Sequence, residues 1–261
     1  MFGDITQVTI FFLILAAFSA GLVDAIAGGG GLIQLPALLI GLPQASTVEV
    51  LGTNKVASIF GTSASALTYR RSVKTDAIFL ATMALPAFFG SVLGALSASL
   101  IPTQSMRPIV FILLVAVAIY TWRKPDLGSI EILRHQKNKR FLISAVAGLV
   151  IGFYDGIFGP GTGSFLMLIL VATLGYAFIT ASAIAKVVNV ATNAGAILVF
   201  GFNGEIIWKV GLTLAIANVA GGLIGARIAI RGGSTLVRKV FMAITAALIL
   251  KVAIDTYTAL R

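Results

Sequence analysis

Long apolar stretches separated by short polar ones run along the whole 261-residue chain. A helix that crosses a membrane needs about 20 apolar residues, and six stretches have about this length. They are 46–69, 75–99, 104–122, 179–200, 206–227 and 239–258. The short alternating segments that mark a membrane β-barrel do not occur in the sequence. The pattern therefore predicts an all-α integral membrane protein.

Two further apolar stretches, 5–41 and 141–173, are too long for a single crossing, and glycines interrupt both. The first contains GGGG at 28–31, and the second contains GPGTG at 159–163. Each glycine lowers the stability of a helix by about 1 kcal/mol relative to alanine. We therefore expect each stretch to form a helix, a break and a second, shorter helix.

The two halves of the chain are copies of each other, displaced by a constant 131 residues. Asp24 then aligns with Asp155, and Lys55 aligns with Lys186. Apolar composition alone would align leucines and alanines, but it would not align an aspartate and a lysine at one displacement. Internal repeats are typical of transporter folds. The expected organisation is a first transmembrane repeat (1–122), a basic cytoplasmic linker (123–140) and a second transmembrane repeat (141–261).

Positive charge predicts how the repeats are oriented, because basic residues concentrate in cytoplasmic loops. The segments 70–74, 227–239 and 123–140 are basic, whereas 201–205 holds no basic residue and 96–108 holds one. All the basic segments lie on one side if the second repeat is inverted, whereas parallel repeats would place one of them outside. We therefore expect inverted repeats, each with three transmembrane helices. Each glycine-broken pair is then a re-entrant hairpin or a full crossing with a short return.

Composition agrees with a membrane location. Hydrophobic residues make up 58% of the chain and charged residues 11%, against about 25% charged residues in soluble domains. The net charge of +10 is expected to serve contact with anionic lipid rather than nucleic acid. The chain has no cysteine, and its one histidine, His135, lies in the linker. We therefore expect no metal, no cofactor and no enzymatic active site.

Four charged residues lie deep in apolar sequence, and they are the two aspartates and two lysines that the repeat aligns. A charge at the centre of a bilayer costs at least about 2.5 kcal/mol. Their retention at equivalent positions indicates a shared internal site. The alternative is that Asp24, Asp155, Lys55 and Lys186 form ion pairs that only hold the helices together.

Polar residues follow both lysines at helical spacing, so each set lies on one face of a helix. The positions are Ser58, Thr62 and Ser65 in the first half, and Asn189 and Asn193 in the second. Such faces fit a substrate path, although helices also pack through residues of these types. The pairs Gly90 and Gly94, and Gly221 and Gly225, have the spacing of helix-packing motifs.

The glycine breaks are also candidate binding elements. Irregular backbone at membrane depth is tolerated only inside protein or beside a cavity. A helix that restarts after a break presents free N–H donors and partial positive charge at its N-terminus. The alternative is a simple kink or a tight turn. The glycines expected to bind the substrate are Gly28, Gly29, Gly30, Gly31, Gly159 and Gly161.

Four segments together resemble the paired signatures of the sulfite exporter TauE/SafE family. They are GLVDAIAGGGGLIQLPALL, LGTNKVASIFGTSASALTYRR, GFYDGIFGPGTGSFL and AKVVNVATNAGAILVF. The resemblance covers nearly the whole chain. It implies a secondary transporter of the bacterial plasma (inner) membrane that moves a sulfur-containing anion: sulfite, thiosulfate or an organosulfonate. It leaves open which anion is moved and in which direction.

The sequence contains no P-loop for ATP, so we expect the energy for transport to come from a gradient or a partner. We expect the repeats to alternate access to a central anion. Lys55 and Lys186 are expected to balance the charge of the anion, and Asp24 and Asp155 to carry coupling protons. The expected hydrogen-bond donors are Thr53, Asn54, Thr62, Asn189 and Asn193. The partners are then a small anion, protons and the lipid bilayer, while the oligomeric state is left open. An anion channel, a transporter of a non-sulfur organic anion and a supporting subunit remain alternatives.

Overall fold

The computed structural model describes residues 7–98 and 128–259, and every regular element in these ranges is a helix. The predicted helix at 104–122 lies outside the described residues. Within them, five helices are long and apolar enough to cross a membrane. These are 7–27, 77–97, 137–157, 178–202 and the first 37 residues of the last helix, 208–244. The prediction of an all-α membrane protein is thus confirmed.

The helices repeat in the second half of the chain. The first half holds α1 (Gln7–Ala27), α2 (Gly31–Gly41), α3 (Thr47–Arg70) and α4 (Ala77–Ser97). The second holds α6 (Lys137–Ile157), α7 (Thr162–Ala172), α8 (Phe178–Phe202) and α9 (Trp208–Ala259). Each helix of the second half begins within one residue of the position that a displacement of 131 predicts.

Both glycine-broken stretches form the predicted pair of a long and a short helix. The breaks are residues 28–30, between α1 and α2, and 158–161, between α6 and α7. Gly41 at the end of α2 lies against Leu13 of α1, so α2 returns alongside α1. With 21 residues, α1 is about 31 Å long, and α2 has 11 residues. The first stretch is therefore a long helix followed by a short return.

Polar residues in the turns fix where the next helices begin. At the start of α3, Ser46 Oγ accepts a hydrogen bond from Glu49 N, and Glu49 Oε2 accepts one from Ser46 N. This reciprocal capping box satisfies two N–H groups that a helix start leaves without partners. Asp76 caps α4 by accepting a hydrogen bond from Ile78 N at 2.9 Å. Such caps stop the apolar helices from running on through the turns.

Helices of the two halves pack closely on glycines. A Cβ atom at Gly90 of α4 would lie 2.2 Å from the carbonyl oxygen of Leu149 in α6. A Cβ atom at Gly221 of α9 would lie 2.0 Å from the carbonyl oxygen of Phe18 in α1. Only glycine allows these backbones to approach so closely. The predicted packing role of the glycine pairs is therefore confirmed, and it joins one half of the chain to the other.

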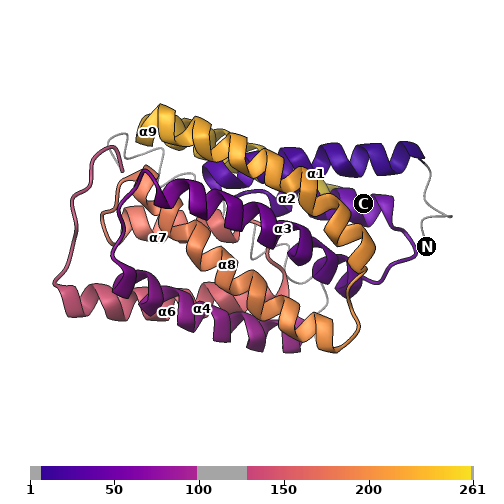
Figure 1. Ribbon diagram of the computed structural model, residues 1–261, viewed down its shortest axis with the longest axis horizontal. Helices are drawn as coiled ribbons and strands as arrows, with labels where there is room; N and C mark the ends of the chain where they lie inside the picture. Colours follow the sequence, from indigo (N-terminus) through magenta and orange to yellow (C-terminus); the bar gives the residue numbers. More distant parts are fainter. Residues whose placement is uncertain (1–6, 99–127, 260–261) are drawn as a thin grey trace.

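The equivalent helices α3 and α8 run in opposite directions (Figure 1). Along the contact of α3 with α9, Val56 lies beside Gly211 and Ser65 lies beside Gly222, so these two helices are parallel. The chain turns back between α8 and α9 within residues 203–207. Hence α8 is antiparallel to α9, and also to α3.

The element α9 consists of two helices that meet at a bend. Gly233 has φ +60°, which glycine adopts without strain. Gly225 lies against Ala25, and Ile244 lies against Gly29. A straight helix would separate Gly225 and Ile244 by about 28 Å, so the chain must turn sharply between them. Both predicted helices are therefore present, but the predicted polar loop at 227–239 is helical apart from this bend.

The predicted linker is shorter than expected, because α6 already begins at Lys137. Its described part pairs with the turn between α7 and α8: Ile132 N donates to Gly175 O and Arg134 N donates to Leu174 O, both at 2.9 Å. The linker is thus attached to the second half of the chain. Its cytoplasmic location remains a prediction.

Many large apolar side chains are exposed on the outside of the molecule, whereas Lys55, Lys186 and Asp155 are buried inside it. Phe89 is 60% exposed and Ile216 is 75% exposed, whereas Lys55 is 2% exposed and Lys186 is fully buried. A soluble protein rarely exposes so many large apolar side chains or buries lysines. This distribution suits a protein whose outer surface faces lipid and whose polar groups serve an internal site.

Candidate functional site

The two glycine breaks meet at the centre of the molecule. Gly28 has φ +77°, and a Cβ atom there would lie 2.3 Å from the carbonyl carbon of Gly163. Both the left-handed conformation and this backbone contact require glycine. Gly31, at the start of α2, faces Pro160 in the other break. The run of glycines therefore allows two irregular segments to touch inside the protein.

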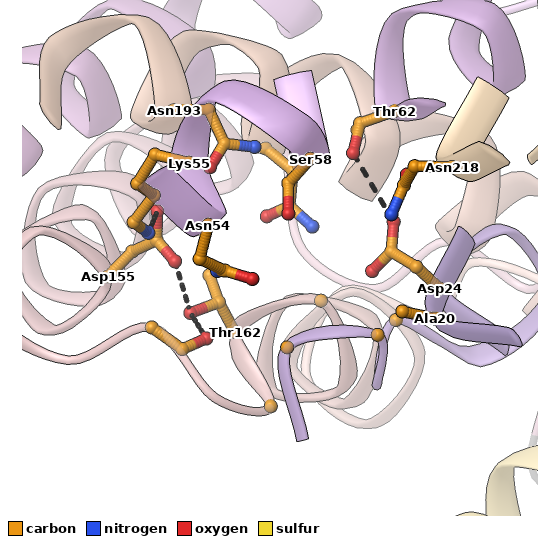
Figure 2. Close-up of a pocket in the computed structure, with 17 residues that line it drawn as sticks. Ala20, Asp24, Asn54, Lys55, Ser58, Thr62, Asp155, Thr162, Asn193 and Asn218 are labelled. Carbon is orange, nitrogen blue, oxygen red and sulfur yellow. Dashed lines mark hydrogen bonds and ion pairs between the residues drawn. The ribbon is translucent and has the colours of Figure 1, made fainter. Parts of the chain in front are cut away.

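A small cavity lies at this meeting point, and both halves of the chain line it (Figure 2). The space open to water-sized groups is about 30 Å³, enough for about two water molecules. Most of the predicted site residues line it. They are Asp24, Gly28, Gly30, Gly31, Asn54, Lys55, Thr62, Asp155, Gly159, Gly161, Asn189 and Asn193.

Two ion pairs connect the halves at the cavity. Lys55 Nζ lies 2.6 Å from Asp155 Oδ2, and Lys186 Nζ lies 2.8 Å from Asp24 Oδ2. Each pair joins the lysine of one repeat to the aspartate of the other. The ion pairs considered from the sequence are thus present, and the four groups in their ionised forms have no net charge. Each lysine is already compensated before any anion enters.

The two pairs have different surroundings. Asp155 Oδ1 accepts a hydrogen bond from Thr162 Oγ1 at 2.7 Å, and the Asp155 side chain is 6% exposed. Asp24 Oδ2 accepts a longer hydrogen bond from Thr62 Oγ1, at 3.4 Å, and the Asp24 side chain is 18% exposed. Lys186 also donates to the main-chain oxygen of Asp24. It is fully buried, so Asp24 lies between it and the cavity.

Two asparagines of the cavity carry oxygens that lack hydrogen-bond partners in the described part of the chain. They are Asn54 of α3, 5% exposed, and Asn189 of α8, 6% exposed. Their Oδ1 atoms are buried and receive no hydrogen bond from the described residues. Buried polar atoms are nearly always paired, so such atoms beside a cavity indicate a place for water or a ligand.

Three predicted site residues do not line the cavity. Thr53 Oγ1 accepts a hydrogen bond from Ile207 N at 2.9 Å, so this residue holds the turn before α9 rather than a ligand. Gly29 faces Ile244, on the other side of the break. Lys186 lies behind Asp24. The two lysines therefore have different positions relative to the cavity: Lys55 borders it and Lys186 does not.

Two buried amides, Asn218 and Gln34, were not predicted from the sequence. Asn218 of α9 lines the cavity and donates from Nδ2 to Gln34 Oε1 at 2.8 Å and to Ala17 O at 3.1 Å. The repeat aligns Gln34 with Phe165 and Asn218 with Ala87. A search for polar residues that recur in both halves cannot find either amide. The feature of the sequence that could have identified them is the presence of an amide side chain in the middle of an apolar stretch.

Metal binding has no support in this part of the molecule. No group of three histidine, aspartate or glutamate side chains within the described ranges lies close enough to share a metal ion. The site instead offers paired charges, side-chain amides, hydroxyls and main-chain N–H groups. Such a set can hold a small polar or charged molecule.

Comparisons with known proteins agree with the resemblance seen in the sequence. The family model described as sulfite exporter TauE/SafE matches residues 13–252. The probable membrane transporter protein ORF9 of Sinorhizobium sp. is 39% identical over 251 residues, which cover 96% of this chain and 94% of that protein. No solved structure matches the chain.

Two further relatives carry similar names. A probable membrane transporter protein of Haemophilus influenzae is 34% identical over 244 residues, 93% of this chain and 94% of that protein. The probable membrane transporter protein YfcA of Escherichia coli is 33% identical over 246 residues, 94% of this chain and 90% of that protein. Together with the family match, these similarities show that the chain belongs to the sulfite exporter TauE/SafE family of membrane transporters.

Proposed function

We propose that this protein is a secondary transporter that carries a small sulfur-containing anion across the bacterial plasma membrane together with a proton. The observation that carries the proposal is the neutral cluster of two lysines and two aspartates beside the central cavity. The sulfur-containing substrate class follows from the description of the family. Sulfite, thiosulfate and organosulfonates are the candidates.

Charge balance is the reason for proton coupling. An anion that enters the cavity alone adds a net negative charge deep inside the protein, where charge is costly. A proton that binds one aspartate removes one negative charge from the cluster. If the anion and the proton both bind, the cluster and a monovalent anion together have no net charge. The anion and the proton therefore favour each other's binding, which supports their movement together.

The contacts available to the anion come from several elements. Lys55 borders the cavity and can share its ammonium between Asp155 and the anion. The helices α2 and α7 both begin at the cavity, and within the described residues neither has a side-chain cap at its N-terminus. Their partial positive charge is thus available to an anion. Amides of Asn54, Asn189 and Asn193 complete the set.

Alternating access by two inverted repeats is the proposed movement. The opposite directions of α3 and α8 support it, as does the positive-inside pattern of the loops. Contacts between the halves at the glycine breaks give a place about which one repeat can rock. The site is then open to one side of the membrane at a time, unlike the pore of an anion channel.

Thermal unfolding of the detergent-purified protein in a panel of anions tests the proposal. Trp208 fluorescence can report unfolding. The panel is sulfite, sulfate, thiosulfate, sulfoacetate, taurine, acetate, phosphate and chloride, at fixed ionic strength. An anion at 100 times its dissociation constant stabilises the folded state by about 2.7 kcal/mol. We expect a selective rise with a sulfur oxyanion or a sulfonate.

Matched variants locate the binding. Asn189→Leu blocks a cavity amide, whereas Asn203→Leu changes an exposed asparagine at the end of the same helix. The rise should disappear in Asn189→Leu and persist in Asn203→Leu. A rise that persists in both variants would place the anion elsewhere. An equal rise with acetate and chloride would argue against a sulfur-containing substrate.

A further inference from the structure

The two aspartates of the cavity are held differently, although the repeat makes them equivalent. Asp155 Oδ1 accepts a hydrogen bond from Thr162 Oγ1 at 2.7 Å, and Asp155 Oδ2 forms an ion pair with Lys55 Nζ at 2.6 Å without the geometry of a hydrogen bond. For Asp24, both contacts end on Oδ2, and Oδ1 accepts no hydrogen bond from the described residues. Figure 2 shows the two acids on opposite sides of the cavity, with Thr162 beside Asp155.

One difference between the repeats contributes to this asymmetry, in addition to the exchange of Thr62 for Asn193 at the equivalent position. Thr162 begins α7, and the equivalent residue at the start of α2 is Gly31. The hydroxyl of Thr162 holds Asp155, whereas Gly31 has no side chain that could hold Asp24. The first repeat leaves the carboxyl of Asp24 with more freedom and with three times the exposure of Asp155.

The lysines differ in the same sense. Lys186 donates to the main-chain oxygen of Asp24 as well as to its carboxylate, so it keeps a partner when the carboxyl becomes neutral. Among the described residues, Lys55 forms its ion pair with Asp155 and would lose it if Asp155 took up a proton. Neutralising Asp24 therefore disturbs the structure less than neutralising Asp155.

We propose that Asp24 alone takes up and releases the coupling proton, and that Asp155 remains ionised as the fixed counter-ion of Lys55. This inference rests on the proposed function and deepens it. The proton adds to the Asp24 carboxylate and leaves the cluster with one net positive charge, which the anion then balances. Each cycle thus moves one proton, so a divalent anion such as thiosulfate carries one net negative charge with it.

The groups that face Asp24 from neighbouring helices fit this role. Lys186 approaches from α8, and Thr62 and Tyr69 approach from α3. The hydroxyl of Tyr69 donates to Ala25 O at 2.9 Å and so is already engaged. The side chain that α9 contributes to the cavity, Asn218, is uncharged. Lys186 is thus the cation paired with Asp24.

The test uses the full-length protein in proteoliposomes and two readouts, with thiosulfate as the probe because it is fully ionised near neutral pH. Exchange of ³⁵S-thiosulfate for unlabelled thiosulfate reports anion binding and movement without net proton transfer. A pH-sensitive dye inside the vesicles reports proton movement driven by a thiosulfate gradient, with the voltage clamped by potassium and valinomycin. The ratio of the two rates measures coupling.

We expect Asp24→Asn to lower the ratio of thiosulfate-driven proton flux to thiosulfate exchange at least tenfold, because asparagine cannot take up and release the coupling proton. Thr162→Val removes the hydroxyl that holds Asp155 but keeps both charges, so its proton-to-anion ratio should remain that of wild type. Asp155→Asn, where it folds, should also retain coupling.

Proton flux retained in Asp24→Asn would overturn the inference, as would coupling lost in Thr162→Val and retained in Asp24→Asn. A wild-type protein that exchanges no thiosulfate would instead overturn the proposed function for this anion, and the inference with it. Active exchange without any proton movement would refute proton coupling while leaving the anion site in place. The failures of the two proposals are thus distinguishable.

Discussion

Removing the ammonium of Lys55 should destabilise the protein strongly, because it leaves a buried carboxylate without its cation. The side chains of Lys55 and Asp155 are 3% and 6% exposed, and their charged atoms lie 2.6 Å apart. Breaking such a pair from one side costs about 3–5 kcal/mol. Lys55→Met keeps much of the side-chain volume, so this cost reflects the orphaned charge rather than a cavity.

A second substitution isolates the electrostatic part. Asp155→Asn in the Lys55→Met background removes the orphaned carboxylate and keeps an oxygen that can accept from Thr162. Neutral replacements of a buried ion pair are often as stable as the pair itself. The double variant should therefore recover most of the lost stability, and the coupling energy in the double-mutant cycle should be at least as large as the stability recovered.

Thermal unfolding in detergent measures the cycle. On the scaling known for soluble domains of this size, the loss in Lys55→Met corresponds to a fall of roughly 10 °C in Tm. Lys74→Met is the matched control, because Lys74 is exposed in the turn between α3 and α4, and it should change stability by less than about 0.5 kcal/mol. A Lys55→Met protein as stable as wild type, or a double variant no better than the single one, would refute the reasoning.

Three other predictions concern packing around the site. Gly28→Ala should prevent accumulation of folded protein, because its Cβ would clash with the opposite break, whereas Gly31→Ala meets atoms only at 3.6 Å and should express normally. Gly90→Ala should lower Tm clearly, since the new Cβ would lie 2.2 Å from a carbonyl oxygen of α6; an unchanged Tm would contradict the packing of α4 on α6. Asn218→Leu should cost about 1–3 kcal/mol in unfolding free energy, because it leaves the buried Gln34 without its donor.

The sequence predicted most of the helix bounds, because the same order of apolar stretches and glycine breaks occurs in both halves. The breaks at 28–31 and 159–163 stood out, since glycines are rare inside long helices and these two fall at one displacement. The extent of the loop between the last two helices was predicted poorly. The basic residues of 227–239 predicted a polar turn. Instead, a single glycine with positive φ reverses the chain, and the basic residues remain helical.

Most of the residues named from the sequence line the cavity, but the pairings of the charged residues were not predicted. Equivalent positions identified both lysines and both aspartates, yet spacing along the chain cannot say which lysine meets which acid. Contact across the repeats decides this, and it places Lys55 on the cavity and Lys186 behind Asp24. Asn218 was missed because its counterpart is an alanine. A comparison of the two halves identifies the residues that both halves share, and it misses residues that only one half carries.

Uptake of ³⁵S-thiosulfate into proteoliposomes, with and without an inward proton gradient, tests the central claim most directly. A proton-coupled transporter should accumulate the anion above its external concentration when the gradient is present and should only equilibrate it when the gradient is collapsed. Empty liposomes set the background. Uptake that stops at equal concentrations under both conditions, and that does not saturate with concentration, would indicate an anion channel and contradict the account.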